Sequence, residues 1–454
     1  MLAASELFKA GRVPNGWLPA LILIFLSIYG LSRWFFDSEP ARGFLPVVNL
    51  LAGALAFSAV LAGIKSTSAR VILVLILVLG GVLQAIQIAL WRSFGSGIET
   101  PWFSELLRSW YEGRINPRLS GSYMSRNNTV WALNSSCLFC LALCIWARWP
   151  AFLKFLCGWF SGLLALTSFL TLSRGGILGL ALGFSLFLGL SLSIIIKSKG
   201  RFRIAALAMT IILLIGVVGA GSWFLANNFL LKERVERVGE DAYRSEAWKP
   251  LLRQIQLAPL WGTGPGSTAH WMRILHSPQL AGTESIYAHN DWLEFTAEGG
   301  IFALVLLLVA LSLSVSIALH GIHSRLISKP DYGIPQSTEA ALGIGALCSI
   351  AAFAIHSFFD YNMQLSSNSL LAFLILGIAV GTRSPQQAAD ELDRANPILS
   401  TSLSASSLFL LPGLAILLTF RNFHDETRAT QIDNAIRLKR PEIALALAKR
   451  VEIS

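Results

Sequence analysis

The chain has 454 residues, of which 54% are hydrophobic and only 14% are charged. Soluble domains carry about 25% charged residues, so this composition excludes an ordinary soluble protein and indicates a membrane protein. The formal net charge of +10 could suggest a nucleic-acid partner. The basic residues lie mostly in short links between apolar runs, however, which is typical of the positive-inside bias. We therefore expect no nucleic-acid partner.

About eleven apolar runs are long enough to cross the roughly 30 Å of hydrocarbon in a bilayer. Backbone polar groups in lipid must be satisfied internally, so each run is predicted to be a helix. The predicted fold class is therefore all-α, a polytopic integral membrane protein with about 11 (10–12) transmembrane helices. The predicted spans are 17–36, 44–64, 70–91, 129–147, 152–171, 176–196, 204–225, 299–319, 340–359, 366–382 and 399–420.

Basic residues in alternate short links predict how the chain is oriented. Lys9 and Arg12 precede the first span, Lys65 and Arg70 flank the start of the third, and Arg148 follows the fourth. These links all fall on one side if the N-terminus is cytoplasmic. The sequence thus predicts a cytoplasmic N-terminus.

Two long loops then lie on the opposite, extracytoplasmic side, at about 92–128 and 226–298. We expect residues 1–420 to form one transmembrane domain that includes the 226–298 loop. The remaining residues, 421–454, form an amphipathic tail on the same side by the count of spans. The tail is compatible with either a helical-repeat domain or a surface helix.

The first of four candidate clusters is Arg174 with Gly175 and Gly176, at the extracytoplasmic start of a span. A guanidinium beside the exposed N–H groups of a helix N-terminus suits an anion. The alternative is a snorkelling arginine with glycines that serve helix packing.

The second cluster lies in the long loop and contains Arg234, Arg237, Arg244 and Trp248, followed by the glycine-rich stretch 259–266. A nucleotide-binding fingerprint is a poor interpretation of the glycines, because no strand precedes them. We expect instead a tight turn that lets the backbone approach a ligand or another helix.

The third and fourth clusters combine histidines with carboxylates. His289-Asn290-Asp291 precedes a span, and its histidine could act as a general base or simply hydrogen-bond to backbone at the start of a helix. His356 and Asp360 end another span, and four-residue spacing predicts that they share one helical face. This pair indicates either a site or a structural ion pair.

Neither the histidines nor the acidic residues have the spacing of zinc or divalent-cation ligands, so no metal and no other cofactor is expected. Cys137, Cys140 and Cys144 lie at helical spacing in one span. We interpret them as small core residues, with a redox or metal pair as the alternative.

In this order, the clusters resemble the O-antigen ligase and polymerase superfamily of bacterial inner membranes. The resemblance covers roughly residues 115–382. Five stretches carry it. In chain order they are 118–122 with Asn127 and Asn128 ahead of the fourth span; 171–176; Arg244 to Gly264; His289-Asn290-Asp291 followed by 298–300; and His356 and Asp360 followed by Asn368.

The resemblance implies a metal-independent glycosyltransferase with a GT-C-like fold, working at the periplasmic face of the inner membrane among membrane lipids. Members move a glycan carried on undecaprenyl diphosphate to lipid A–core, as ligases, or to another lipid-linked repeat, as polymerases. By this resemblance Arg174 and Arg244 would hold the diphosphate, and His289 would deprotonate or orient the acceptor hydroxyl. The further residues expected to bind substrate are Arg118, Asn128, Arg234, Arg237, Asn290, Asp291, His356 and Asp360.

A membrane transporter for bicarbonate or another small anion is the main alternative. Transporters usually place ionisable residues near mid-membrane within repeated halves, whereas the interiors of these spans are nearly free of charge and show no clear repeat. A non-catalytic membrane scaffold would leave the arginine and histidine clusters unexplained.

Overall fold

The computed structural model describes residues 17–35, 40–94, 125–197, 204, 242–275, 287–327 and 335–383. All of them belong to one compact unit, Met1–Asn396. Apart from residue 204, the predicted spans 204–225 and 399–420 lie outside the described residues, as do most of the first long loop and the 421–454 tail. Within the described part the regular structure is entirely helical.

Each predicted span in this part coincides with a helix. Eight of these helices are long and apolar enough to cross a membrane, and α15 is apolar but shorter. The described part is therefore a polytopic helical bundle, as predicted. The helices are α2 (Leu18–Phe35), α3 (Pro40–Gly63), α4 (Thr67–Phe94), α6 (Arg126–Trp146), α7 (Ala151–Leu170), α8 (Arg174–Lys197), α11 (Ala242–Leu257), α12 (Thr268–Leu275), α13 (Asp291–Leu326), α14 (Thr338–His356) and α15 (Ser366–Gly381).

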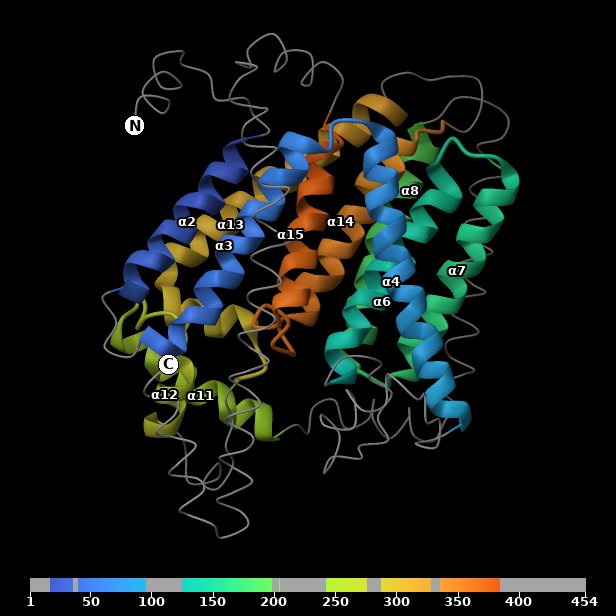
Figure 1. Cartoon of the computed structure of the whole chain (residues 1–454). Coiled ribbons are helices and arrows are strands. Elements are labelled where there is room, and N and C mark those ends of the chain that lie inside the picture. Colours follow the sequence, from blue (N-terminus) through green and yellow to red (C-terminus); the bar gives the residue numbers. More distant parts are fainter. Residues whose placement is uncertain are drawn as a thin grey trace, which may run out of the picture. The chain divides into compact units, whose positions relative to one another are not determined.

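Helices α6 and α14 form the centre of the bundle. They are the most buried of the candidate spans, with 83% and 67% of their apolar stretches inside the protein. α14 packs against α6 and α8, α15 packs against α3, and α2 packs against both α3 and α13 (Figure 1). In contrast, α7 exposes the large apolar side chains of Phe152, Phe155 and Trp159, as a lipid-facing helix does.

Glycines on α8 allow this close central packing. A Cβ at Gly175 would lie 2.8 Å from the His356 ring, and a Cβ at Gly179 would lie 2.6 Å from the Ala352 carbonyl oxygen on the same neighbouring helix. Small residues at a helix interface let backbones approach in this way. The packing role considered for the glycines after Arg174 is therefore present.

Helix α13 extends well beyond the predicted span 299–319. It begins at Asp291 and ends at Leu326, and it is broken at Gly300, whose φ of 74° and ψ of 174° are not helical. Apolarity alone could not show the first segment, because residues 291–298 are rich in polar groups. The polar segment before Gly300 is the part of α13 that contributes to the candidate site.

The break in α13 is filled by the turn around Gly262. The N–H groups of Ile301 and Phe302 donate to the carbonyl oxygens of Pro259 and Leu260 at 2.9 and 3.2 Å. Without the break, these N–H groups would donate to residues four positions earlier in their own helix. The turn thus replaces intrahelical acceptors.

The same turn also supplies donors to the α13 carbonyl groups that lose their intrahelical partners at the break. The N–H groups of Thr263 and Gly264 donate to Ala297 and Glu298, each at 3.0 Å. Buried backbone groups need partners, so this exchange keeps the broken helix fully hydrogen-bonded. The predicted tight turn is therefore confirmed, and its neighbour is another helix.

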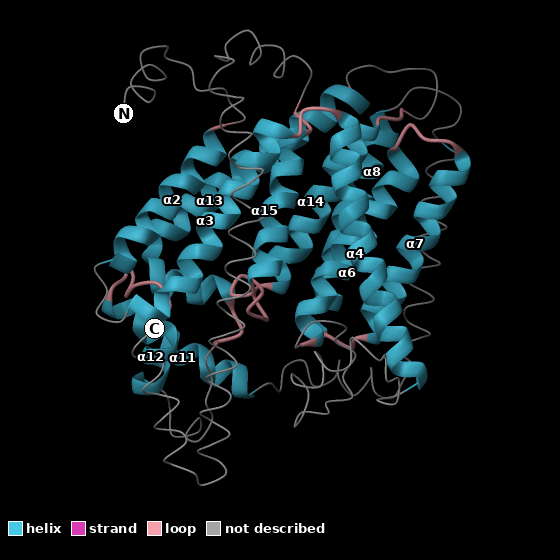
Figure 2. Ribbon diagram, in the orientation of Figure 1, coloured by secondary structure: helices cyan, strands magenta, loops and turns pink. Residues whose placement is uncertain are grey.

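The connections of the bundle gather at its two ends (Figure 2). The described parts of the four sequence clusters lie at one end, in or beside residues 171–174, 258–267, 287–291 and 356–365. The opposite end carries the turns at 64–66, 147–150, 335–337 and 382–383. Segments far apart in sequence are thus brought to a single end.

A buried ion pair ties helices together at the end opposite the clusters. Arg70 of α4 binds Glu339 of α14 through Nη2 and Oε1 at 2.7 Å, and both side chains are nearly buried. Arg70 also donates to the carbonyl oxygens of Ile64 and Lys65. The pair connects the N-terminal helices to the central helix.

Replacing Glu339 by alanine should destabilise the protein by about 3 kcal/mol, because a buried guanidinium loses its carboxylate. Thermal unfolding of the purified protein measures this. The control is Glu246→Gln, which removes the more exposed Lys249–Glu246 pair and should change stability by less than about 1 kcal/mol. Equal effects of the two changes would contradict the role given to the buried pair.

Candidate functional site

A histidine–aspartate pair lies at the end of the bundle where the clusters meet. His289 Nδ1 and Asp360 Oδ1 are 3.2 Å apart, although 71 residues separate them in sequence. The histidine side chain is 27% exposed, whereas the aspartate is 2% exposed. The pair thus presents an accessible imidazole that a buried carboxylate holds from behind.

The backbone around His289 is fixed in an unusual conformation. His289 has φ of 54°, a left-handed value that is uncommon outside glycine and often marks functional sites. Before it, the Ala288 carbonyl accepts from Trp248 Nε1 at 3.1 Å, and the Ala288 N–H donates to Glu294 at 3.4 Å. After it, Asn290 caps α13. Contacts on both sides therefore maintain the strain.

The start of α13 is joined to the connection between α14 and α15. Asn290 Oδ1 accepts from the N–H of Leu293 at 3.1 Å. The N–H of Asp291 donates to the Ser357 carbonyl at 2.8 Å, and Asp291 Oδ2 accepts from the N–H of Met363 at 3.0 Å. These bonds set the distance between His289 and Asp360.

His356 and Asp360 do not share a helical face, contrary to the prediction from their spacing. α14 ends at His356 rather than at 359, and Ser357 is its C-cap. The two side chains still approach across the following turn, with His356 Nε2 3.9 Å from Asp360 Oδ2. Asp360 therefore lies between two histidines from different segments.

The surroundings of Asp360 favour its charged form. Burial raises the pKa of Asp360, but the hydrogen bond with His289 and the neighbouring imidazoles lower it, and the balance leaves the pKa below its usual range. Its Oδ1 also accepts from the N–H of Tyr361 at 3.0 Å. We expect a carboxylate at neutral pH, which suits a partner for an imidazole that gains a proton.

Two tyrosines flank the exposed imidazole. Tyr361 meets the His289 ring edge-on with centroids 4.9 Å apart, and it stacks on Tyr287 at 4.6 Å. Burial, followed by the charge of Asp360, raises the pKa of Tyr361 to about 12. This phenol therefore stays neutral and offers an aromatic wall rather than a base. The sequence analysis gave neither tyrosine a role, because only the fold pairs them.

The start of α8 places Arg174 beside the same cluster. Ser173 Oγ accepts from the Gly176 N–H at 3.3 Å and so caps the helix, and the half-buried Arg174 is its first helical residue. The adjacent Gly175 lies against the His356 ring. Leu172, just before the cap, has φ of 54°. Among the described non-glycine residues, only Leu172 and His289 have positive φ, and both flank predicted clusters.

Asn128 lies inside a helix rather than ahead of it. It falls in the first turn of α6, which begins at Arg126. Its carbonyl accepts from Asn368 Nδ2 at 3.1 Å, and the same amide donates to Asn362 Oδ1 at 3.1 Å. Asn368 thus connects α6 to the connection that carries Asp360.

The remaining predicted arginines are less fully placed. Arg244 lies in the first turn of α11, but its side chain is outside the described residues. Arg118, Arg234 and Arg237 also lie outside them. The structure therefore brings together the predicted residues Arg174, Asn128, His289, Asn290, Asp291, His356 and Asp360 at one end of the bundle.

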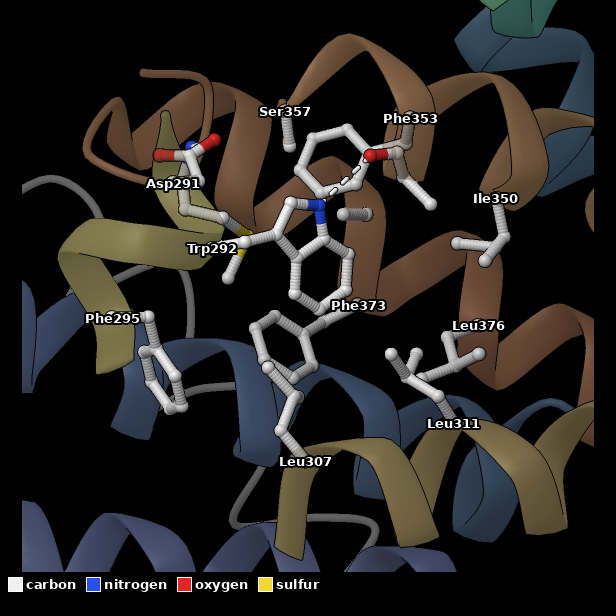
Figure 3. Close-up of a pocket in the computed structure, with 13 residues that line it drawn as sticks. Asp291, Trp292, Phe295, Leu307, Leu311, Ile350, Phe353, Ser357, Phe373 and Leu376 are labelled. Carbon is white, nitrogen blue, oxygen red and sulfur yellow. Dashed lines mark hydrogen bonds between the residues drawn. The ribbon is translucent and has the colours of Figure 1, made fainter. Parts of the chain in front are cut away.

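An apolar cavity lies directly behind Asp291. Figure 3 shows the Trp292 indole inside it, with Phe373 and Phe353 nearby and Leu311 and Leu376 at the end away from Asp291. The indole N–H donates to the Ala354 carbonyl at 2.9 Å. The site thus has a polar rim and an apolar interior within one end of the bundle.

Within the described residues, no group of three histidines, cysteines or carboxylates is placed to hold a metal ion. The five cysteines are free and buried or half-buried. Cys137 and Cys140 belong to the main apolar core, as interpreted from the sequence. The candidate chemistry rests on arginine, histidine and carboxylate side chains.

These features define a polytopic helical membrane protein with a histidine–aspartate pair at one end of its bundle. Residues 159–308 match the model of the O-antigen ligase family. This confirms the predicted similarity to the O-antigen ligase and polymerase superfamily, which points to a membrane glycosyltransferase. The matched residues include Arg174 and His289, whereas His356 and Asp360 lie beyond them. No curated protein matches the chain.

Proposed function

We propose that the protein transfers a glycan from undecaprenyl diphosphate to an acceptor hydroxyl at the periplasmic face of the bacterial inner membrane. The acceptor belongs either to lipid A–core or to another lipid-linked glycan. The single observation that carries the proposal is the His289–Asp360 pair, an exposed imidazole backed by a buried carboxylate. The family match over residues 159–308 supports the reaction class.

His289 serves as the general base in this proposal. With Nδ1–H directed at Asp360, Nε2 carries the lone pair. Nε2 takes the proton of the acceptor hydroxyl while its oxygen bonds to the anomeric carbon of the donor. The bond from that carbon to the diphosphate oxygen breaks, and undecaprenyl diphosphate leaves. Asp360 positions His289 and stabilises the imidazolium that forms.

Arg174 stabilises the leaving diphosphate. The guanidinium offers a planar fork for phosphate oxygens, and the α8 N-terminus adds backbone N–H groups. Arg244 acts with it, and fixed positive charges take the place of a divalent metal. Arg118, Arg234, Arg237, Asn128, Asn290, Asp291 and His356 remain proposed contributors to substrate binding or to the shape of the site.

Replacing Arg174 by alanine should lower glycan transfer by about 10²- to 10³-fold, as expected when one donor to a developing anion is lost. The measurement is transfer by the purified protein from an undecaprenyl-diphosphate glycan to lipid A–core or to a second lipid-linked glycan. Each acceptor is assayed separately and with EDTA present. Transfer should persist in EDTA with the productive acceptor.

The matched control is Arg148→Ala, because Arg148 is an exposed arginine at the opposite end of the bundle. It should transfer at the wild-type rate. Wild-type transfer by Arg174→Ala would exclude the diphosphate role, and no transfer to either acceptor by the wild-type protein would contradict the proposed reaction. Loss in EDTA that a divalent ion restores would contradict the metal-free mechanism.

A further inference from the structure

A second cavity, which also has Asp291 in its lining, lies between α2, α3 and the first segment of α13. Its volume is ≈ 710 Å³ including its open mouth. We name it the α2–α3 pocket. Its polar lining residues are Tyr29, Arg33, Asn49, Asp291, Glu298, Gln364 and Ser369.

The pocket contains buried polar atoms that the described part of the protein does not satisfy. Asn49 and Ser369 are 5% and 1% exposed, and Asn49 Oδ1 and Ser369 Oγ have no hydrogen-bond partner among the described residues. Arg33 Nε is in the same state, although its Nη2 donates to the Gly262 carbonyl at 2.9 Å. Unsatisfied buried groups in one cavity indicate a missing polar ligand.

The orientation of Asn49 defines what this ligand must supply. Asn49 Nδ2 donates to the Gln364 carbonyl at 3.2 Å, so the Asn49 amide oxygen is the atom without a partner among the described residues. That amide oxygen is an acceptor, Arg33 Nε is a donor, and the Ser369 hydroxyl is both. A ligand with several hydroxyl groups satisfies both kinds, because each hydroxyl donates and accepts.

The pocket has few groups that could hold a phosphate-bearing ligand. Among its described lining residues Arg33 is the one cationic side chain, and its Nη2 already donates to the Gly262 carbonyl. A diphosphate needs several charged donors. The other wall is apolar and includes Leu26, Val47 and Phe295, so the lining suits a sugar ring, which has hydroxyl groups at its edge and apolar faces.

The position of the pocket relative to His289 fits one substrate of the proposed reaction. Asp291, two residues after His289, is part of its wall. Arg174, which is proposed to hold the diphosphate, is the first residue of α8 and lies beside His356. Helix α8 contributes no lining residue to the pocket. The two substrates would therefore reach the imidazole from different sides.

We infer that the α2–α3 pocket binds the uncharged sugar of a lipid-linked acceptor. This inference rests on the proposed function and adds the place and chemical class of the acceptor. Asn49 and Ser369 bind hydroxyl groups, and Arg33 donates to a hydroxyl or ring oxygen. These residues determine which acceptor binds and take no part in the transfer step itself.

Binding to nanodiscs tests the inference without catalysis. The full-length protein is placed in phosphatidylethanolamine nanodiscs, which are doped with either monoglucosyl diacylglycerol or phosphatidylglycerol, and bound lipid is read by native mass spectrometry. The glycolipid should bind preferentially, and Ser369→Ala should weaken it about three- to tenfold, the usual effect of one lost hydrogen bond. Asn49→Ala should weaken it at least as much.

The control is Ser58→Ala on α3, whose hydroxyl bonds to its own helix at Ala54 and does not line the pocket. It should bind like wild type. Ser369→Ala should also keep the wild-type melting temperature, because its hydroxyl has no partner among the described residues to lose. A lower melting temperature in this variant would show that the hydroxyl serves the fold, which contradicts the inference.

Three binding results overturn the inference: no glycolipid adduct, equal binding of phosphatidylglycerol, or wild-type binding by Ser369→Ala. None of them depends on transfer activity, so the proposed function stands or fails separately on Arg174→Ala. Preferential glycolipid binding without any transfer would instead preserve the pocket and exclude the proposed function.

Discussion

Replacing His289 by alanine is expected to lower glycan transfer by about 10²- to 10⁴-fold, the usual contribution of a positioned general base. The variant should still fold and insert, because the imidazole is partly exposed and belongs to none of the apolar cores. Some stability is lost, because Asp360 loses a hydrogen bond and alanine adopts left-handed backbone less readily than histidine. The measurement is the steady-state rate of transfer at saturating donor, together with the amount of protein in the membrane.

The control for this loss is His320→Ala. His320 is exposed near the far end of α13, so its removal should leave both rate and membrane level unchanged. Full activity in His289→Ala would exclude the imidazole as the base. A fall in membrane level that matches the fall in rate would attribute the loss to folding instead.

Replacing Gly262 by alanine should destabilise the protein by at least about 3 kcal/mol. Gly262 has φ of 70°, which is strained for any residue with a Cβ, and its Cβ would overlap the Glu298 carbonyl across the break in α13. Relieving this contact requires the turn to withdraw and leaves backbone groups unpaired. Thermal unfolding and the amount of membrane-inserted protein measure the effect.

Gly189→Ala on α8 is the matched control, because a Cβ there meets nothing within 4 Å. In a helix this change is expected to be neutral or to stabilise by up to about 1 kcal/mol. If Gly262→Ala were as stable as Gly189→Ala, the reciprocal hydrogen bonding between the turn and α13 would not hold the end of the bundle together.

Span positions could be predicted from sequence because they follow from composition over about twenty residues. The apolar runs that predicted 129–147 and 152–171 match α6 and α7 within three residues. Local patterns also placed Arg174 at a helix start. These features depend on neighbours along the chain, so a single sequence contains them.

The break in α13 could not be predicted in this way. Residues 299–319 are apolar, and two glycines at a span's start are compatible with an unbroken helix. The break at Gly300 forms because backbone groups near Pro259, some forty residues earlier, exchange hydrogen bonds with it. Such a partner is visible only in the fold.

The candidate site was predicted in residue types but not in geometry. His289, His356 and Asp360 were all singled out, yet the expected pair was His356 with Asp360 on one helix. The closer contact joins Asp360 to His289 across 71 residues, because α14 ends at His356 and the chain turns. Arg33 was not among the predicted residues, although a basic residue at the predicted extracytoplasmic end of the first span is unusual under the positive-inside rule.

The most direct test of the central claim, that His289 and Asp360 act together on the acceptor hydroxyl, is a double-mutant cycle on glycan transfer. kcat/KM is measured for the wild type, His289→Ala, Asp360→Asn and the double variant. If the two residues act as one unit, Asp360→Asn should lower kcat/KM by at least roughly 100-fold, and the double variant should be no slower than His289→Ala. Losses that multiply in the double variant, or a wild-type rate in Asp360→Asn, would contradict the account.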